Sequence, residues 1–251
     1  YLEIEDVWGC VPSFANPVKE MLVASDDDVC EVVKKLKDAW NIGEDGILSV
    51  TDLLESKNIK VVEIKADSSF DGLSGYVNND ENMPFVVVNK SFDVERLRFT
   101  GLHELGHLVM NLPEEMEKKD KERLCNLFAS EMLISRDIFV DVLGERRSDI
   151  SLQELKVLQA VYGISVDALM FKAKTVGVIS ESKHTSFCIR KNKSLAFKDA
   201  VERSSYRGVE ESSRFDRLVY RALASDMISC SKAAVLLNEP MEEVKNKLEL
   251  V

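Results

Sequence analysis

The spacing of apolar residues in the first fifth of the chain predicts two helices. Between residues 28 and 40 they recur every three or four positions, which predicts an amphipathic helix. A shorter helix follows, capped by Ser49 or Thr51, whose hydroxyl groups can accept hydrogen bonds from free backbone N–H groups. Residues 1–25 lack this period and contain two of the five prolines, so we expect a linker-like N-terminal segment there.

The apolar period then shortens to that of a β-strand. Residues 59–64 predict one strand, and residues 73–77 and 84–88 predict two more. The turn-forming residues 78–82 separate the last two, so we expect these strands to form a hairpin.

Two longer helices are expected after the strands. Helical spacing predicts one over residues 94–111, which Pro113 stops, and another over residues 118–134. The order of helices, strands and helices is that of a small α+β domain, which we assign to residues 26–145.

Residues 146–251 form a mostly helical C-terminal region in this interpretation. Residues 187–197 predict a weak hairpin, and the polar residues 198–213 predict a loop. Helical spacing and capping residues predict the other elements, which are helices over residues 151–162, 165–174, 214–228 and 232–237 and a last one that starts at Pro240.

Composition narrows the class of protein. Apolar residues make up 45% of the 251 residues, and no apolar run reaches the roughly 20 residues that span a bilayer, so we expect no membrane contact. With 33 basic against 44 acidic residues the net charge is −11, so we expect no direct nucleic-acid binding by this fragment. Because the chain starts with Tyr1 and lacks a signal-peptide pattern, we expect it to be part of a longer protein.

The cysteines indicate a reducing, cytoplasmic location. They are scattered, odd in number and without a Cys-x-x-Cys pair, which favours free thiols over a disulfide framework or a cysteine zinc site. The five are Cys10, Cys30, Cys125, Cys188 and Cys230.

The candidate chemistry lies in the pentapeptide His103-Glu104-Leu105-Gly106-His107. Residues four apart share a helix face, so His103 and His107 can bind one Zn²⁺ ion. Zinc lowers the pKa of a bound water towards about 7, and Glu104 can take its proton as the general base. The same carboxylate can then protonate the departing amine. Two of the chain's three histidines lie in this segment, which favours a metal site over an accidental pattern.

A catalytic zinc site needs a third protein ligand and an open fourth position. No third histidine follows at the spacing of the longer histidine-rich motifs, so the ligand should be a carboxylate on the next helix. Glu122 and Glu131 are both candidates, and spacing alone does not choose between them.

The sequence around these residues resembles a known family. Residues 98–107 (RFTGLHELGH) and 122–134 (ERLCNLFASEMLI) are similar to the active-site segments of ImmA/IrrE-type metallopeptidases, although Ser135 stands where that family usually has proline. The resemblance implies a zincin-like fold, one Zn²⁺ per chain, and Glu122 as the third ligand. It also implies an XRE-type helix-turn-helix regulator domain upstream, which this chain does not include.

The predicted hairpin resembles the paired strands beside the active-site cleft of that family. An exposed strand edge there can bind an extended peptide through main-chain hydrogen bonds. Tyr76, Val86 and Val88 are therefore candidate substrate-binding residues. The same residues are equally typical of core strands, so the alternative stays open.

Two functional hypotheses follow. The first is a cytoplasmic, zinc-dependent, site-specific endopeptidase, and the resemblance implies that it cleaves a helix-turn-helix repressor or an antitoxin, derepressing genes in stress or mobile-element responses. The second is a transcription regulator or antitoxin component whose peptidase-like domain serves as a sensor or docking module. Glu104 favours the first, because a pure binding module needs no general base.

Overall fold

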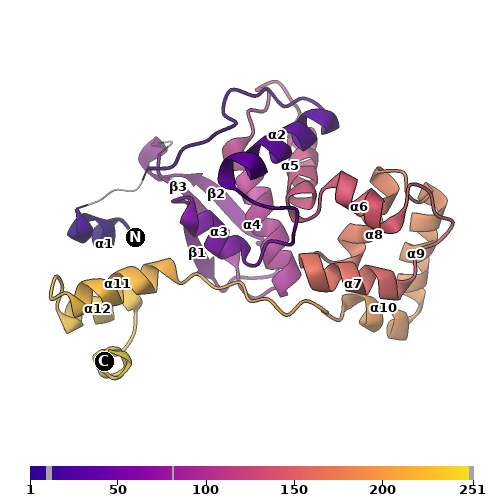
Figure 1. Cartoon of the computed structure of the whole chain (residues 1–251). Helices are drawn as coiled ribbons and strands as arrows, with labels where there is room; N and C mark the ends of the chain where they lie inside the picture. Colours follow the sequence, from indigo (N-terminus) through magenta and orange to yellow (C-terminus); the bar gives the residue numbers. More distant parts are fainter. Residues whose placement is uncertain (10–12, 81, 249–251) are drawn as a thin grey trace.

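The computed structural model describes residues 1–9, 13–80 and 82–248; Cys10 and Glu81 lie outside these ranges. A three-stranded sheet and its covering helices lie in the middle of the molecule, with further helices on two sides (Figure 1). The predicted α+β fold class is confirmed. Every helix in the described ranges is too short or too polar to cross a membrane.

The sheet consists of β1 (Lys60–Ile64), β2 (Gly72–Tyr76) and β3 (Pro84–Asn89). β3 lies in the centre, antiparallel to β2 and parallel to β1, which confirms the predicted hairpin. β2 is therefore an edge strand of the sheet that the described residues form. One face of β3 is buried against helix α4, because alternate residues of a strand point to opposite faces.

Helix α4 (Val94–Val109) lies on the sheet and packs against α5 (Lys118–Leu133), so both long helices are confirmed. Gly106 makes this packing possible, because a Cβ at that position would lie 3.2 Å from Cδ1 of Phe128 on α5. α2 (Asp26–Trp40) covers α5, and α3 (Val50–Ser56), capped by Ser49 as predicted, packs on α4 and β1.

The helices after α5 continue the same hydrophobic core. Buried side chains from residues 14 to 201 form one cluster, so the core has no break at the predicted boundary between residues 145 and 146. Ser151 and Ser165 cap their helices as predicted. The elements are α6 (Arg136–Leu143), which the sequence pattern missed, α7 (Leu152–Tyr162), α8 (Val166–Thr175), α9 (Glu181–Lys193) and α10 (Leu195–Glu202).

The hairpin predicted at residues 187–197 is wrong, and so is the first part of the predicted loop at 198–213. Helices α9 and α10 occupy these positions. Their junction brings the rings of Phe187 and Phe197 to 5.9 Å, so aromatic packing between two helices replaces the expected cross-strand contact. Residues 204–213 have no regular structure and run back along the molecule as a strap (Figure 1).

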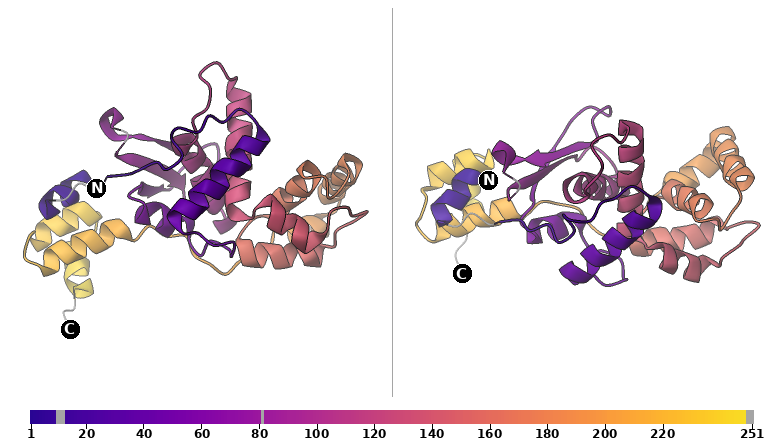
Figure 2. Two further views of the ribbon diagram at one scale, coloured as in Figure 1. Left: turned by 45° about the horizontal axis from the view of Figure 1, so that its top comes forward. Right: turned by 90° about the horizontal axis from the view of Figure 1, so that it is seen from above.

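A second, smaller core joins the two ends of the chain. Helix α1 (Leu2–Trp8) lies beside the C-terminal helices (Figure 2), and its Ile4 is fully buried among their side chains. The linker predicted for residues 1–25 is therefore wrong over this helix, because its apolar partners lie about 200 residues away in sequence. These partners are α11 (Arg214–Ala224), α12 (Cys230–Leu237) and α13 (Met241–Lys247).

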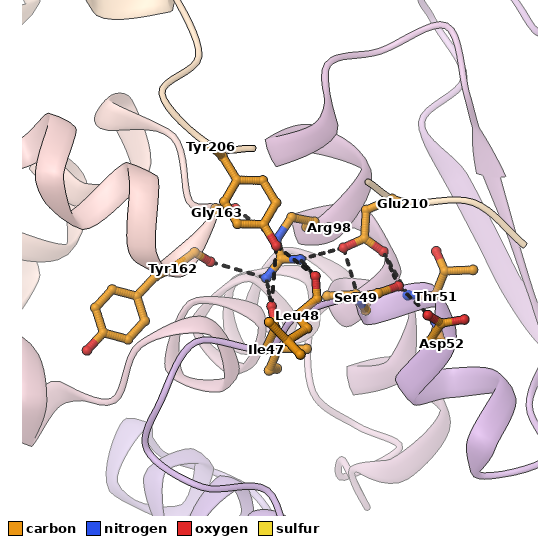
Figure 3. Close-up of polar contacts among 11 residues, drawn as sticks. Ile47, Leu48, Ser49, Thr51, Asp52, Arg98, Tyr162, Gly163, Tyr206 and Glu210 are labelled. Atoms are coloured by element: carbon orange, nitrogen blue, oxygen red, sulfur yellow. Dashed lines mark hydrogen bonds and ion pairs between the residues drawn. The ribbon is translucent and has the colours of Figure 1, made fainter. Parts of the chain in front are cut away.

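Arg98, in the first half of α4, is fully buried and holds several segments together (Figure 3). Its guanidinium donates hydrogen bonds to backbone carbonyls on both sides, at residues 47–48 and 162–163. Gly163, at φ 60°, allows this approach, because a Cβ there would lie 2.4 Å from Nε of Arg98. Arg98 also forms a buried ion pair with Glu210 of the strap.

The strap closes this arrangement from outside, as Figure 3 shows. Glu210 accepts hydrogen bonds from the backbone N–H groups of Val50 and Thr51, the free donors at the start of α3. Tyr206 stacks on Arg98 at 4.5 Å and donates to the carbonyl of Leu48 at 2.7 Å. We call Arg98, Tyr206, Glu210 and the groups they bind the Arg98 cluster; it fixes the start of the helix that carries the pentapeptide.

Candidate metal centre

The second half of α4 presents two histidines at one point. His103 and His107 lie one turn apart, and their Nε2 atoms are separated by 3.1 Å. Both residues line a cleft, in which His103 is half-buried and His107 is exposed. The helical spacing seen in the sequence thus gives two converging nitrogen donors.

Glu122 of α5 completes a set of three donors. Its Oε2 lies 3.2 Å from Nε2 of His103 and 3.6 Å from Nε2 of His107. A tetrahedral ion with bonds of about 2.0–2.2 Å separates its ligands by about 3.3–3.6 Å, so the two distances from Glu122 lie at or just below this range. The three residues form a group that can hold a metal ion.

Two neighbours on α5 orient the histidine rings from behind. The side-chain oxygen of Asn126 lies 2.9 Å from Nδ1 of His103. An amide oxygen only accepts hydrogen bonds, so Nδ1 carries the proton and, in the neutral ring, Nε2 offers its lone pair to the donor set. Sγ of Cys125 lies 3.4 Å from Nδ1 of His107. Burial, with the Glu122 and Glu104 carboxylates nearby, raises the pKa of this thiol to about 12, so it stays protonated at neutral pH.

Glu104 faces the cleft beside the donor set without belonging to it. Its side chain is 8% exposed, and its Oε2 accepts a hydrogen bond from the Ser74 hydroxyl of β2 at 2.7 Å. One carboxylate oxygen is therefore held against the edge strand. This arrangement fixes the orientation of a carboxylate next to the metal-binding group, as a general base requires.

The cleft runs between β2 and the two long helices. The preceding loop contributes Ser69, Phe70 and Asp71, β2 contributes Gly72 to Ser74, and the two helices contribute the histidines, Glu104, Glu122 and Asn126. An open strand edge thus borders the donor set on one side.

Residues 54–174 match the family model described as the IrrE N-terminal-like domain, Peptidase_M78. They form an ImmA/IrrE-type metallopeptidase domain. The matched segment includes all three strands, α4, α5 and the whole donor set. No curated protein matches the chain.

Glu131, the other candidate for the third ligand, has a structural role in the metallopeptidase domain. Glu131 is buried and forms an ion pair with Lys172 of α8, while its other oxygen accepts a hydrogen bond from the backbone N–H of Arg136 at 2.8 Å. It therefore lies in the core, away from the histidines, and joins α5 to α8. Lys172, the partner of Glu131, lies 41 residues further along the chain.

Of the three residues predicted to bind substrate, Val86 and Val88 lie in the core, and Tyr76 is half-buried. Val86 and Val88 are 0% and 5% exposed, because they lie on the buried face of the central strand. The Tyr76 hydroxyl donates to the carbonyl of Leu108 at 2.7 Å, and its ring lines a separate hollow beyond the end of the cleft. Only the wider expectation, a strand edge at the cleft, agrees with the structure, and β2 provides it.

Two residues at the centre had no assigned role from the sequence. Asn126 lies four positions after Glu122, so the helical spacing that pairs the histidines could also have identified it. Ser74 gave no such signal, because its contact with Glu104 depends on how β2 lies against α4.

Proposed function

We propose that this chain is a zinc-dependent endopeptidase in which His103, His107 and Glu122 hold the metal and Glu104 is the general base. The observation that supports this most directly is the convergence of the three donors beside a carboxylate that the Ser74 hydroxyl holds in place. A zinc ion held there would supply a Lewis acid and lower the pKa of water towards neutrality.

The chain's own residues provide the proton transfers. The Glu104 carboxylate takes a proton from the attacking water and delivers it to the departing amine nitrogen, so one group serves both steps. The Ser74 hydroxyl keeps Oε2 of Glu104 in place at the wall of the cleft. Asn126 holds His103 in the tautomer that binds a metal.

The edge of β2 is the proposed binding site for the peptide backbone. An extended segment can add to an edge strand through main-chain hydrogen bonds, which are independent of sequence. β2 lies beside Glu104, so a segment bound there passes the donor set.

The proposed substrate is a regulatory protein in the cytoplasm, either a helix-turn-helix repressor or an antitoxin. The resemblance of residues 98–107 and 122–134 to ImmA/IrrE-type peptidases supports this. The net charge of −11 makes the chain itself a poor DNA binder, which fits a protein target better than a nucleic acid.

The test compares wild type with Glu104→Gln on a purified repressor encoded beside this gene. We expect both proteins to contain one zinc ion, and wild type to cut the repressor at a single bond. The variant should be slower by about 10²–10⁴. Equal cleavage by both proteins would show that Glu104 is not the base.

The rival function is a sensor or docking module with little turnover. It predicts that wild type binds the repressor without cutting it, and that the zinc-loaded Glu104→Gln variant binds equally well. Size-exclusion chromatography together with N-terminal sequencing of any fragments separates the two functions.

A further inference from the structure

A second hollow, mostly apolar, lies between α5 and the pair α8–α9. Its volume is about 700 Å³. We call it the α5–α8 groove. Its apolar walls are Phe99, Leu127, Ala168, Phe171, Val176 and Phe187.

This groove begins where the metal cleft ends. Phe99, Glu122 and Asn126 line both hollows, so the donor set and the groove share a wall. From Glu122 the groove follows one face of α5 as far as Ser130, two turns further along. A polypeptide held at the donor set therefore has an apolar surface next to it.

The walls expose apolar surface that a folded protein normally covers. The side chain of Phe171 is 54% exposed and forms one wall, although it lies on a well-packed helix. Charged residues also line the groove, among them Asp26, Lys119 and Arg123, but most of its surface is apolar. A mostly apolar hollow with some charged residues in its lining is typical of a site that binds a peptide side chain.

We propose that the α5–α8 groove is the specificity pocket for a large apolar side chain of the substrate next to the cleaved bond. The proposal rests on the proposed endopeptidase function and adds to it the chemistry of the residue that is recognised. It assigns this recognition to Leu127, Ala168 and Phe171, which lie outside the donor set. Polypeptides with an aliphatic or aromatic residue at the cut are selected over those with a charged one.

The first experiment measures binding without turnover. The probes are succinyl hydroxamates, which chelate zinc, carrying an isobutyl group, a carboxymethyl group or no side chain. With zinc-loaded protein, calorimetry should show the isobutyl compound binding roughly ten- to a hundredfold more tightly than the unsubstituted one. Equal affinities for all three compounds would overturn the proposal.

Two variants, each with a matched control, test whether the preference for the isobutyl compound comes from the groove. Ala168→Trp should fill it and remove the advantage of the isobutyl compound, while the unsubstituted compound binds as before. Ala200→Trp, at a half-buried alanine of α10 outside the groove, is the control and should keep the advantage. Phe171→Ser should reduce the preference, and Val157→Ser on α7, also 54% exposed, should not. If Ala168→Trp keeps the full preference, the groove is not the pocket.

A metal-independent measurement separates failure of this proposal from failure of the proposed function. If no hydroxamate binds, the zinc function is wrong, but the groove can still be tested. Metal-free protein is irradiated with a pentapeptide that carries benzoylphenylalanine at its centre. We expect labels on α5, α8 and α9 that Ala168→Trp removes; labels elsewhere would overturn the proposal. A wild-type dimer that Ala168→Trp converts to a monomer would instead make the groove an interface between copies.

Discussion

Helix α4 carries two polar clusters of opposite character. In the Arg98 cluster the cation is 0% exposed, and its donors meet a carboxylate and four carbonyl oxygens of the protein. At the candidate metal centre, one turn further on, two imidazole nitrogens and a carboxylate oxygen lie close together, and His107 is exposed to solvent. In the first cluster the protein supplies both the cation and its acceptors, whereas the second is a group of donors that can hold a metal ion. A single helix thus carries the Arg98 cluster, which has a structural role, and a second cluster suited to a chemical one.

The largest expected effect comes from Arg98→Met. It leaves the Glu210 carboxylate buried without its cation, which should lower the free energy of unfolding by about 3–5 kcal/mol. Urea unfolding of the metal-free protein measures this loss. Arg96→Met is the control, because Arg96 lies on the same helix and its ion pair with Asp71 is half exposed; its loss should stay below about 1 kcal/mol. Similar losses for both variants would show that the buried Arg98 cluster contributes no more to stability than an exposed ion pair.

A second comparison uses the two glutamates of α5. Glu122→Ala should lose zinc on dialysis while its metal-free stability changes by less than about 0.5 kcal/mol, because the side chain lies at an open site. Glu131→Ala should retain zinc and lose stability, since it leaves Lys172 buried without the carboxylate that neutralises it. Metal analysis and urea unfolding of both variants check this. Zinc loss in Glu131→Ala alone would reverse the ligand assignment.

A smaller effect is expected from Asn126→Ala. Without the hydrogen bond to Nδ1, His103 is no longer held in its metal-binding tautomer, so zinc affinity should fall about 10–100-fold. Competition with a chromophoric chelator measures the affinity. Asn126→Asp keeps an acceptor at the same place and should retain most of it. An unchanged affinity in Asn126→Ala would mean that the packing of α4 alone orients the ring.

The smallest effect concerns the strap. Tyr206→Phe removes the hydroxyl that donates to the carbonyl of Leu48 at 2.7 Å and, more weakly, to that of Ile47 at 3.5 Å, so the free energy of unfolding should fall by about 0.5–1.5 kcal/mol. Zinc affinity should not change, because the stacked ring still covers Arg98. A change in zinc affinity would show that the two clusters of α4 are coupled.

The sequence predicted those features that depend on neighbours a few residues away. The pairing of His103 with His107, the hairpin and the caps at Ser151 and Ser165 all follow from local spacing, and the structure contains them. The choice between Glu122 and Glu131 did not follow from spacing, because the cation that neutralises Glu131 lies on α8. In this region the resemblance to a family supplied what local physics could not.

The errors have the same origin. Helix α1 gives no helical signal in the sequence because its seven residues, about two turns, have little stability of their own, and its apolar partners lie at the other end of the chain. Residues 187–197 were read as strands from their local composition, whereas packing against α8 and α10 makes them helical. Val86 and Val88 were equally compatible with a cleft or a core until the strand order placed β3 in the centre.

The ion pair between Arg98 and Glu210 also has a consequence for folding during synthesis. The two residues are 112 positions apart in the chain. At a synthesis rate of about 5–20 residues per second, Glu210 is added to the chain roughly 6–20 s after Arg98. The helix that bears both histidines is thus anchored at its start only after most of the protein has been made. Translation therefore delays the completion of the peptidase until the strap that follows it has emerged.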